Sequence, residues 1–190
     1  MLRAVSQVEP LSRAVNGHRG VRMTAEEILQ QIRARFGSEI RTSEVRRGEA
    51  TLTIKADQNF EICRFIKEEL GLEYLNCLSG VDWVGENEME VAYAISSLRQ
   101  PGKIILRARV PRDEPVLRSV VPLWGTANWH EREAFDLLGI RFENHPDLRR
   151  ILLPEDWIGH PLRKDYQDER FVPYPWDDRK PGTVVRPTTA

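Results

Sequence analysis

The sequence has few cysteines: the 190-residue chain contains only two, Cys63 and Cys77. An iron–sulfur cluster usually needs four cysteine ligands, and structural zinc needs four cysteines or histidines at characteristic spacings. Neither pattern occurs, so the sequence contains no motif for either centre. Cys63 lies in a helical pattern and Cys77 in an apolar, strand-like run. Two reduced thiols in the core are therefore predicted rather than a disulfide.

The chain also lacks an excess of charge of either sign, because 28 basic side chains stand against 29 acidic ones. Non-specific nucleic-acid binding depends on surplus lysine and arginine, so no nucleic-acid partner is expected. No run of about 18 apolar residues is present, and no direct membrane span is expected. With 41% hydrophobic residues, the composition is that of a globular domain with a real core.

Residues 1–23 show no core pattern and are predicted to be a flexible N-terminal extension. Their four arginines and single acid, Glu9, faintly resemble a transit peptide, but no clear amphipathic helix accompanies them. Met23 stands directly before a well-formed helix start. A flexible extension, or a misassigned start codon, explains these residues better than a targeting segment.

Residues 24–140 predict an α+β domain. The expected elements are a helix that starts at the capping box Thr24 and Glu27 and ends at Gly37, a hairpin over 39–57, a helix over 59–70, and strands over 72–83, 88–98 and 103–110. The order helix, two strands, helix, three strands predicts a two-layer domain with a mixed or antiparallel sheet and helices on one face. A further helix is expected from near Thr126 to Leu138.

Two of these strands alternate clearly between apolar and polar residues. Met89, Val91, Tyr93 and Ile95 share one side of the first, and Ile104, Leu106, Ala108 and Val110 share one side of the second. The segment 72–83 is apolar without clean alternation, which fits a strand buried on both faces or one interrupted by a bulge.

Residues 141–190 are predicted to form a long, extended, proline-rich C-terminal arm. They hold seven of the twelve prolines, which break helices and sheet interiors. They also carry apolar anchors such as Trp157, Phe171 and Trp176, in which disordered linkers are poor. The arm can lie on its own domain or on another protein. Fifty extended residues could span about 150 Å, which favours partner subunits as the host.

Three of the four histidines, His130, His145 and His160, lie in one stretch at intervals of fifteen residues. Zinc sites usually place two ligands within a few residues of each other, and Ala134 stands where HExxH would need its second histidine. A metal site, and with it a stand-alone metal-dependent hydrolase, is a remote alternative. The favoured interpretation is that His145 and His160, each followed by proline, hydrogen-bond the turns they occupy.

The same stretch places Glu131, Glu133 and Asp136 on one expected helix with Arg132. Arg132 can pair with Asp136 at i+4, which neutralises both charges and does not favour a raised carboxylate pKa. A solvated or ion-paired helix face is therefore predicted rather than a general acid. No nucleophile elbow, P-loop or GxGxxG motif occurs. The arginines, carboxylates and apolar residues that alternate along the arm favour protein binding over catalysis.

The pattern ERE-x2-D-LL-x6-HPDLRR runs from Glu131 to Arg150, and GHPLRKDY follows at Gly159 to Tyr166. It resembles the signature of the 30 kDa (C-type) subunit of respiratory complex I, the NADH:quinone oxidoreductase. "VDW" at 81–83 and "VPRDEP" at 110–115 fit as well, and the resemblance covers roughly residues 70–174. Gln167 stands where that family usually has proline, and His130 at an often aliphatic position.

The resemblance implies a structural and assembly subunit of the peripheral arm, with no catalytic site and no flavin, cluster or metal of its own. FMN, iron–sulfur clusters and quinone would be held by partner subunits. The chain would pack against the large 49 kDa-type quinone-site subunit and neighbouring iron–sulfur subunits, on the cytoplasmic side of the bacterial inner membrane. The alternative is the same subunit in a related membrane-bound hydrogenase, F420-dependent or ferredoxin-dependent complex.

By the same resemblance, fourteen residues are expected to build structure and interface. They are Glu131, Arg132, Glu133, Asp136, His145, Pro146, Asp147, Arg149, Arg150, His160, Pro161, Arg163, Lys164 and Asp165.

Overall fold

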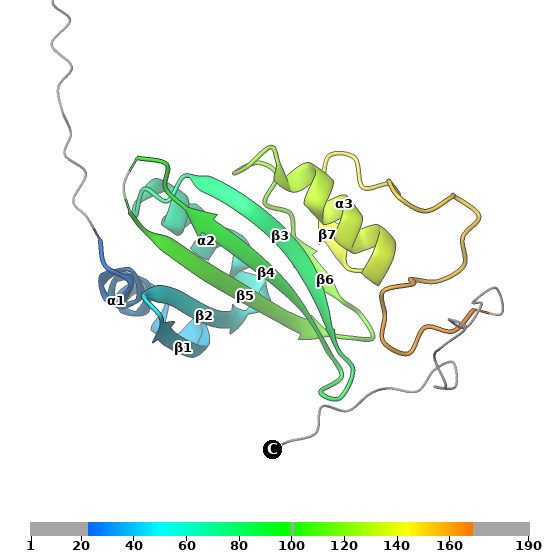
Figure 1. Ribbon diagram of the computed structural model, residues 1–190, viewed down its shortest axis with the longest axis horizontal. Helices are drawn as coiled ribbons and strands as arrows, with labels where there is room; N and C mark the ends of the chain where they lie inside the picture. The colour runs from blue at the N-terminus through cyan, green and yellow to red at the C-terminus, as the bar shows by residue number, and fades with distance from the viewer. Residues whose placement is uncertain (1–22, 100, 169–190) are drawn as a thin grey trace, which may run out of the picture.

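The computed structural model describes residues 23–99 and 101–168 (Figure 1). The elements are α1 Ala25–Phe36, the 3-10 turn η1 Gly37–Glu39, β1 Ile40–Arg46, β2 Glu49–Lys55, the 3-10 turn η2 Ala56–Gln58, α2 Asn59–Glu68, β3 Tyr74–Trp83, β4 Glu88–Ser96, β5 Lys103–Pro111, β6 Val116–Arg118, α3 Ala127–Leu138 and β7 Arg141–Glu143. This order confirms the predicted α+β class. The expected N-terminal extension, apart from its last residue, and the end of the arm lie outside the described residues.

The first helix begins as its sequence predicts. The Thr24 hydroxyl accepts a hydrogen bond from the Glu27 backbone N–H at 3.2 Å, and the Glu27 carboxylate accepts one from the Thr24 N–H at 2.7 Å. This reciprocal pair satisfies two of the N–H groups that a helix start leaves without partners. Ile28, Leu29 and Ile32 then turn toward the sheet and are buried.

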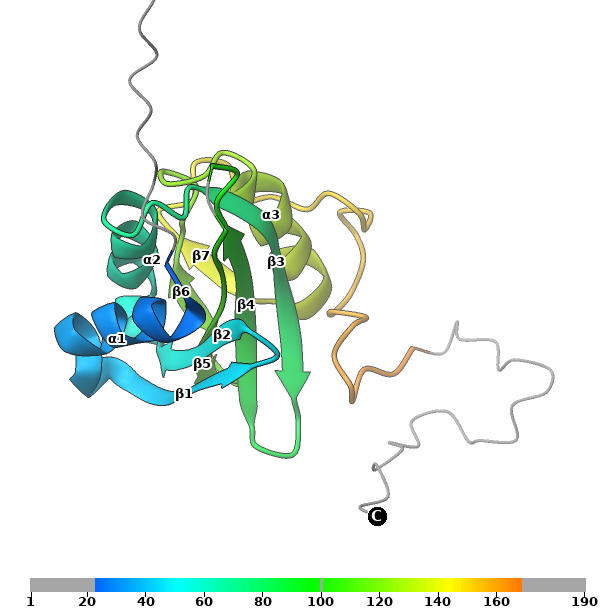
Figure 2. The same cartoon turned by 60° about the vertical axis from the view of Figure 1, so that its left-hand side comes forward.

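The five-stranded sheet is mixed, with the order β1-β2-β5-β4-β3. β2 and β5 run parallel, with Leu52 opposite Leu106, and the other neighbours are antiparallel. The predicted inward residues of β4 and β5 are all buried. Figure 2 shows α1 and α2 on one side of the sheet, and Asn59 at the start of α2 donates to the Tyr93 hydroxyl at 3.2 Å.

α3 extends this helical layer over the edge strand β3. The space between them depends on Gly80, because a Cβ there would collide with Leu138 and lie 3.0 Å from Ile140 Cδ1. The short parallel pair β6 and β7, which flanks α3 in the sequence, was not predicted from the sequence. Strands of three residues are too short to show a periodic pattern.

The structure decides between the two interpretations of β3 and corrects one prediction about cysteine. The register between β3 and β4 shifts between Leu75 and Cys77, so β3 is a bulged strand rather than one buried on both faces. After the bulge, Leu78 pairs with Tyr93 on the core side, and Cys77 pairs with Ala94 on the other side. Cys63 is buried as predicted, but Cys77 is exposed, so the prediction of two core thiols is wrong for Cys77.

Candidate interaction surface

The acidic and basic residues of α3 are mostly buried, so of the two predicted alternatives the solvated helix face is wrong, whereas Asp136 does form an ion-paired contact, with Arg150. Glu131, Arg132 and Asp136 are buried and only Glu133 is exposed. The reason is that α3 has neighbours on two sides. One side meets the core and β3, and another meets residues 144–168, the described part of the predicted arm that follows β7 (Figure 1).

Asp136 holds the arm by its backbone. Its Oδ2 atom accepts hydrogen bonds from the N–H groups of three consecutive residues, Ile151, Leu152 and Leu153, at 3.1, 2.8 and 2.9 Å. Burial raises the pKa of Asp136, but these three bonds and the Arg150 guanidinium, 3.6 Å from Oδ1, outweigh burial and lower it from 3.8. Asp136 is therefore an ionised anchor for the arm.

Arg132 does not pair with Asp136, so the predicted i+4 ion pair is wrong. Its Nε and Nη2 atoms donate instead to the backbone carbonyls of Arg149 and Arg150, at 3.1 and 3.3 Å. The guanidinium also lies 5.1 Å from the centre of the Trp129 ring. Sequence spacing identified two residues on the same side of the helix, but the nearby backbone of the arm supplies the partners of both.

Glu131 points toward the core instead. Its carboxylate accepts hydrogen bonds from the Ser119 hydroxyl at 2.6 Å and from the Val120 N–H at 2.7 Å. Burial raises its pKa from 4.5 to about 7, because desolvation outweighs these two hydrogen bonds. Sequence reasoning considered the pKa only for the pairing of Arg132 with Asp136 and did not indicate the raised pKa of Glu131.

His145 lies beside Glu131 where the chain leaves β7. Its Nδ1 atom accepts a hydrogen bond from the Asp147 N–H at 3.0 Å, within its own turn as predicted. Its Nε2 atom lies 3.3 Å from the Asn128 carbonyl and 3.9 Å from Glu131 Oε2. This arrangement places the proton of the neutral ring on Nε2. Burial lowers the pKa of His145, which favours the neutral form.

Residues 160–163 cover the end of α3. His160 Nδ1 lies 2.9 Å from the Asp136 carbonyl, the Leu162 N–H donates to the Leu137 carbonyl at 3.1 Å, and Arg163 Nε donates to the Leu138 carbonyl at 2.8 Å. These carbonyls belong to the last turn of the helix, where backbone C=O groups have no hydrogen-bond donors within the helix itself. The prediction that the His160 ring bonds its own turn is wrong, because its partner is on α3.

Asp165 and Lys164 attach the next part of the arm to the sheet. The Arg112 guanidinium bridges the buried Asp82, at 2.7 and 3.0 Å, and Asp165. The Lys164 N–H donates to Asp82 at 2.8 Å. The sequence interpretation did not select Asp82 or Arg112. The available signal was that both stand inside the segments "VDW" and "VPRDEP".

The remaining members of the predicted set are less involved. Asp147 and Arg149 form an exposed ion pair at 2.9 Å. Pro146 is exposed and Pro161 is half-buried. Among the described residues, no three or more His, Cys, Asp or Glu side chains are arranged to hold a metal ion, and His130 is half-buried on α3. No described helix is both long and apolar enough to cross a membrane.

Large apolar side chains project from α3 and the arm into solvent. They are Trp129, Leu152, Ile158 and Leu162, with exposed fractions of 64%, 59%, 83% and 54%. We call these four residues the α3–arm surface. The backbone N–H groups of Leu152 and Leu162 are bonded to α3, and the Ile158 carbonyl accepts a hydrogen bond from the Tyr166 hydroxyl at 2.9 Å, so the backbone at these three positions is held by hydrogen bonds. Exposed apolar groups on an ordered backbone are typical of a protein-binding surface rather than a catalytic site.

Comparison with known proteins identifies the family of the chain. The family model described as "Respiratory-chain NADH dehydrogenase, 30 Kd subunit" matches residues 52–172. The C-type subunit of the NADH-quinone oxidoreductase of Geotalea uraniireducens is 41% identical over 152 residues, which is 80% of this chain and 89% of the relative. The C-type subunit of the F(420)H(2) dehydrogenase of Methanosarcina mazei is 39% identical over 150 residues, or 76% and 93% of the two chains.

Two solved structures share the fold. The trypsin-resistant fragment (1-134) of Nqo5 is 30% identical with a TM-score of 0.56, and the match covers 65% of this chain and 98% of the fragment. A chain of the archaeal membrane-bound sulfane sulfur reductase is 23% identical with a TM-score of 0.68, over 84% and 98% of the two chains. The family model and the NADH-quinone oxidoreductase relatives show that the chain belongs to the family of the 30 kDa subunit of the respiratory-chain NADH dehydrogenase.

Proposed function

We propose that this chain is a structural and assembly subunit of NADH:quinone oxidoreductase, without a catalytic site of its own. It packs through the α3–arm surface on the large 49 kDa-type subunit that helps to form the quinone site, next to iron–sulfur subunits of the peripheral arm. FMN, the clusters and quinone are bound by those partners. The complex places the chain on the cytoplasmic side of the bacterial inner membrane.

The observation that carries this proposal is the combination of buried anchors and exposed apolar groups. Asp136 and Arg132 bind the arm's backbone, while Leu152, Ile158 and Leu162 of the same segment remain in solvent. Burying one large apolar side chain contributes about 1.5–3 kcal/mol, so a partner that covers the α3–arm surface gains several such contributions. Because the segment is already ordered on α3, little conformational entropy opposes docking.

The proposal includes the division of the chain. Residues 24–140 form the domain, residues 141–190 form the arm that continues over partner subunits, and residues 1–23 are an extension outside the docking surface. The bonds from residues 151–163 to α3 support an arm that runs along the outside of the domain, and the chain leaves the domain only after β7, whose Phe142 is buried in the core.

A second candidate keeps the same type of subunit and changes the complex. The identity to the F(420)H(2) dehydrogenase relative, 39%, is almost the same as that to the NADH-quinone oxidoreductase relatives. The electron-input module lies on other chains in both cases, so the α3–arm surface serves either complex. Related hydrogenases and ferredoxin-dependent complexes belong to the same alternative.

The test is affinity purification of the tagged chain from its native cell in mild detergent, with mass spectrometry and an NADH–quinone assay on the eluate. We expect flavin and iron–sulfur subunits and NADH oxidation. The variant with Ile158→Glu and Leu162→Glu should reduce co-purification at least tenfold. Leu98→Glu is the matched control, since Leu98 is 74% exposed but lies after β4, outside the α3–arm surface. It should have no effect.

Other outcomes would redirect the assignment. F420-linked, hydrogenase or ferredoxin-linked subunits in the eluate would establish the second candidate. Equal losses in both variants would contradict the α3–arm surface as the docking site. A lone chain that contains zinc or manganese, and loses metal in His145→Ala, would replace the proposal with the hydrolase alternative.

A further inference from the structure

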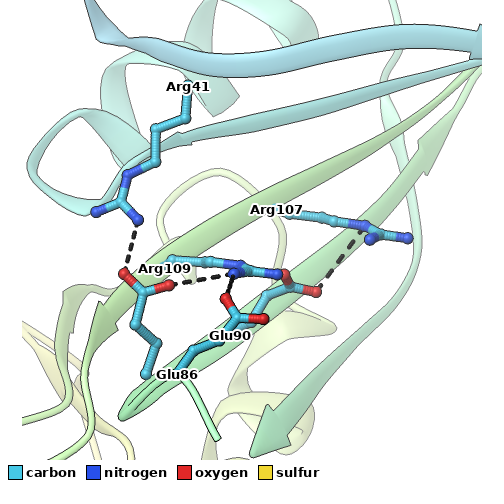
Figure 3. Close-up of polar contacts among 6 residues, drawn as sticks. Arg41, Glu86, Glu90, Arg107 and Arg109 are labelled. Atoms are coloured by element: carbon cyan, nitrogen blue, oxygen red, sulfur yellow. Dashed lines mark hydrogen bonds and ion pairs between the residues drawn. The ribbon is translucent and has the colours of Figure 1, made fainter. Parts of the chain in front are cut away.

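The sheet has a second face, turned away from the helical layer, on which no described element packs (Figure 1). One end of it carries six charged side chains from β1, β4, β5 and the turn after β3, drawn in Figure 3. We call them the arginine–glutamate cluster. They are Arg41, Glu86, Glu88, Glu90, Arg107 and Arg109.

Arg109 is the centre of the cluster. Its guanidinium donates to Glu90 at 3.0 Å, to Glu88 at 3.2 Å and to Glu86. It also lies over the Trp83 ring, 4.6 Å from the ring centre. Glu88 accepts a further bond from Arg41 at 2.7 Å. All three carboxylates therefore have arginine partners, and the cluster is held in place by several bonds.

Glu90 is buried although it points to this open face, with 3% of its side chain exposed. Burying a charge is costly unless it is paired, and here the pairing is complete before any partner arrives. The desolvation of Glu90 and part of Arg109 thus takes place during folding rather than on binding. A rigid, partly dehydrated charged surface of this kind favours binding of a complementary charged group.

Arg107 is the member of the arginine–glutamate cluster whose guanidinium has no hydrogen-bond partner among the described residues. Its contact with Glu90 is 3.9 Å, which is too long for a hydrogen bond, and its Nε atom is buried without a partner among the described residues. Trp83 Nε1 is also buried and without a described partner. Both atoms are buried, so neither can be reached by a partner. The rest of the Arg107 side chain is partly exposed and makes no hydrogen bond to a described residue, whereas every carboxylate of the cluster has an arginine partner. The exposed part of the Arg107 guanidinium is therefore the donor that this face offers.

The approach to Arg107 is open. The residues directly opposite it on the neighbouring strands are Ala92 and Thr53, both small. The Arg107 side chain remains 40% exposed between them. A planar guanidinium in this position can form two parallel hydrogen bonds with one carboxylate.

We propose that this open face is a second docking surface, which binds an acidic segment of another protein chain of the same complex through Arg107. A carboxylate of that segment accepts from the Arg107 guanidinium, and the small side chains beside Arg107 leave the space for it. The inference rests on the proposed function only in taking the chain to work inside a complex. It concerns the opposite side of the sheet from the α3–arm surface.

The test uses the assembled complex with Arg107→Lys and a zero-length carbodiimide, which joins an amine to a carboxylate in contact with it. We expect mass spectrometry to find a cross-link from position 107 to an aspartate or glutamate of another chain. Lys103 on the same strand is the internal control, because its ammonium lies 2.7 Å from Glu49 and should cross-link within the chain. A Lys103–Glu49 cross-link with none from position 107 to another chain would overturn the proposal.

A second measurement is the binding of the purified chain to the subcomplex that lacks it. Arg107→Gln should raise the half-saturating concentration about tenfold, the usual effect of losing one charge-assisted hydrogen bond. Lys103→Gln should leave it unchanged. If Ile158→Glu weakens binding and Arg107→Gln does not, this inference fails and the proposed function stands. If the wild-type chain does not bind, both fail. Binding of a single-stranded DNA probe that Arg107→Gln abolishes would assign the face to nucleic acid and overturn the proposal.

Discussion

Replacing Glu131 with glutamine tests whether the buried carboxylate at the base of the arm is protonated in the folded protein. Glu131 is fully buried and has two hydrogen-bond partners, the Ser119 hydroxyl and the Val120 N–H. Glutamine has the same shape. Its amide oxygen can accept from Val120 and its amide nitrogen can donate to the Ser119 oxygen. The substitution therefore removes the ionisation and retains the packing.

The size of the expected change in unfolding free energy follows from the pKa of Glu131, which burial raises from 4.5 to about 7. The folded protein holds its proton more tightly than the unfolded chain, so this stabilising contribution is complete below about pH 4.5 and is lost as the pH rises through about 7. At about 1.4 kcal/mol per pKa unit, the loss is on the order of 3 kcal/mol. Glu131→Gln cannot ionise, so it should differ little from wild type at pH 5 and be more stable at pH 8.

The assay is urea unfolding of wild type and Glu131→Gln at half-unit steps from pH 5 to pH 8. Glu133→Gln is the matched control, because Glu133 is an exposed glutamate two residues away on α3. Its unfolding free energy should follow that of wild type at each pH. If Glu131→Gln were instead less stable than wild type by a growing margin toward pH 8, Glu131 would be ionised. The Ser119 hydroxyl and the Val120 N–H would then be the groups that stabilise its charge.

Two further predictions concern the attachment of the arm and the packing of α3. Asp136→Asn replaces an ionised acceptor of three backbone N–H groups with a neutral one. A loss of about 2 kcal/mol should make trypsin cut after Arg149 and Arg150 more than tenfold faster in the isolated chain. Glu133→Gln is the control, because Glu133 is exposed on the same helix, and it should not change the rate. Equal rates in both variants would contradict the anchor role. Gly80→Ala adds a Cβ that collides with Leu138, and because overpacking of this kind costs about 1–3 kcal/mol, the thermal unfolding midpoint should fall by several degrees. Gly85→Ala, with open space around the added Cβ, should leave the midpoint unchanged. An unaltered midpoint in Gly80→Ala would show that α3 does not pack on Gly80.

Local chemistry explains why much of the domain could be predicted. The capping box at Thr24 and Glu27 depends on residues three apart, and the alternation in β4 and β5 depends on neighbours two apart. These interactions lie within a single element, so their sequence spacing is sufficient evidence. The short strands β6 and β7 have no such signal, because each contributes three residues and is stabilised by pairing with a segment far along the chain.

The candidate surface shows the opposite case. Sequence reasoning selected a stretch of α3 and the arm whose residues contact one another in the structure, but it assigned wrong partners to Arg132, Asp136 and His160. Each of these side chains bonds backbone groups of a segment 15 to 24 residues away, and backbone groups are the same at every position in a sequence. Nothing in the side-chain pattern could therefore indicate which peptide groups would be their partners.

By itself the sequence determined the order of the longer helices and strands, the apolar faces of β4 and β5, and membership of the 30 kDa subunit family through a long ungapped motif. Those properties follow from local periodicity and residue identity. Only the tertiary structure decided that Glu131 is buried and Glu133 exposed, that Cys77 faces outward after a bulge, and that Arg107 Nε has no acceptor among the described residues. Burial and hydrogen-bond partners depend on which distant segments pack together, and a sequence pattern does not specify that packing.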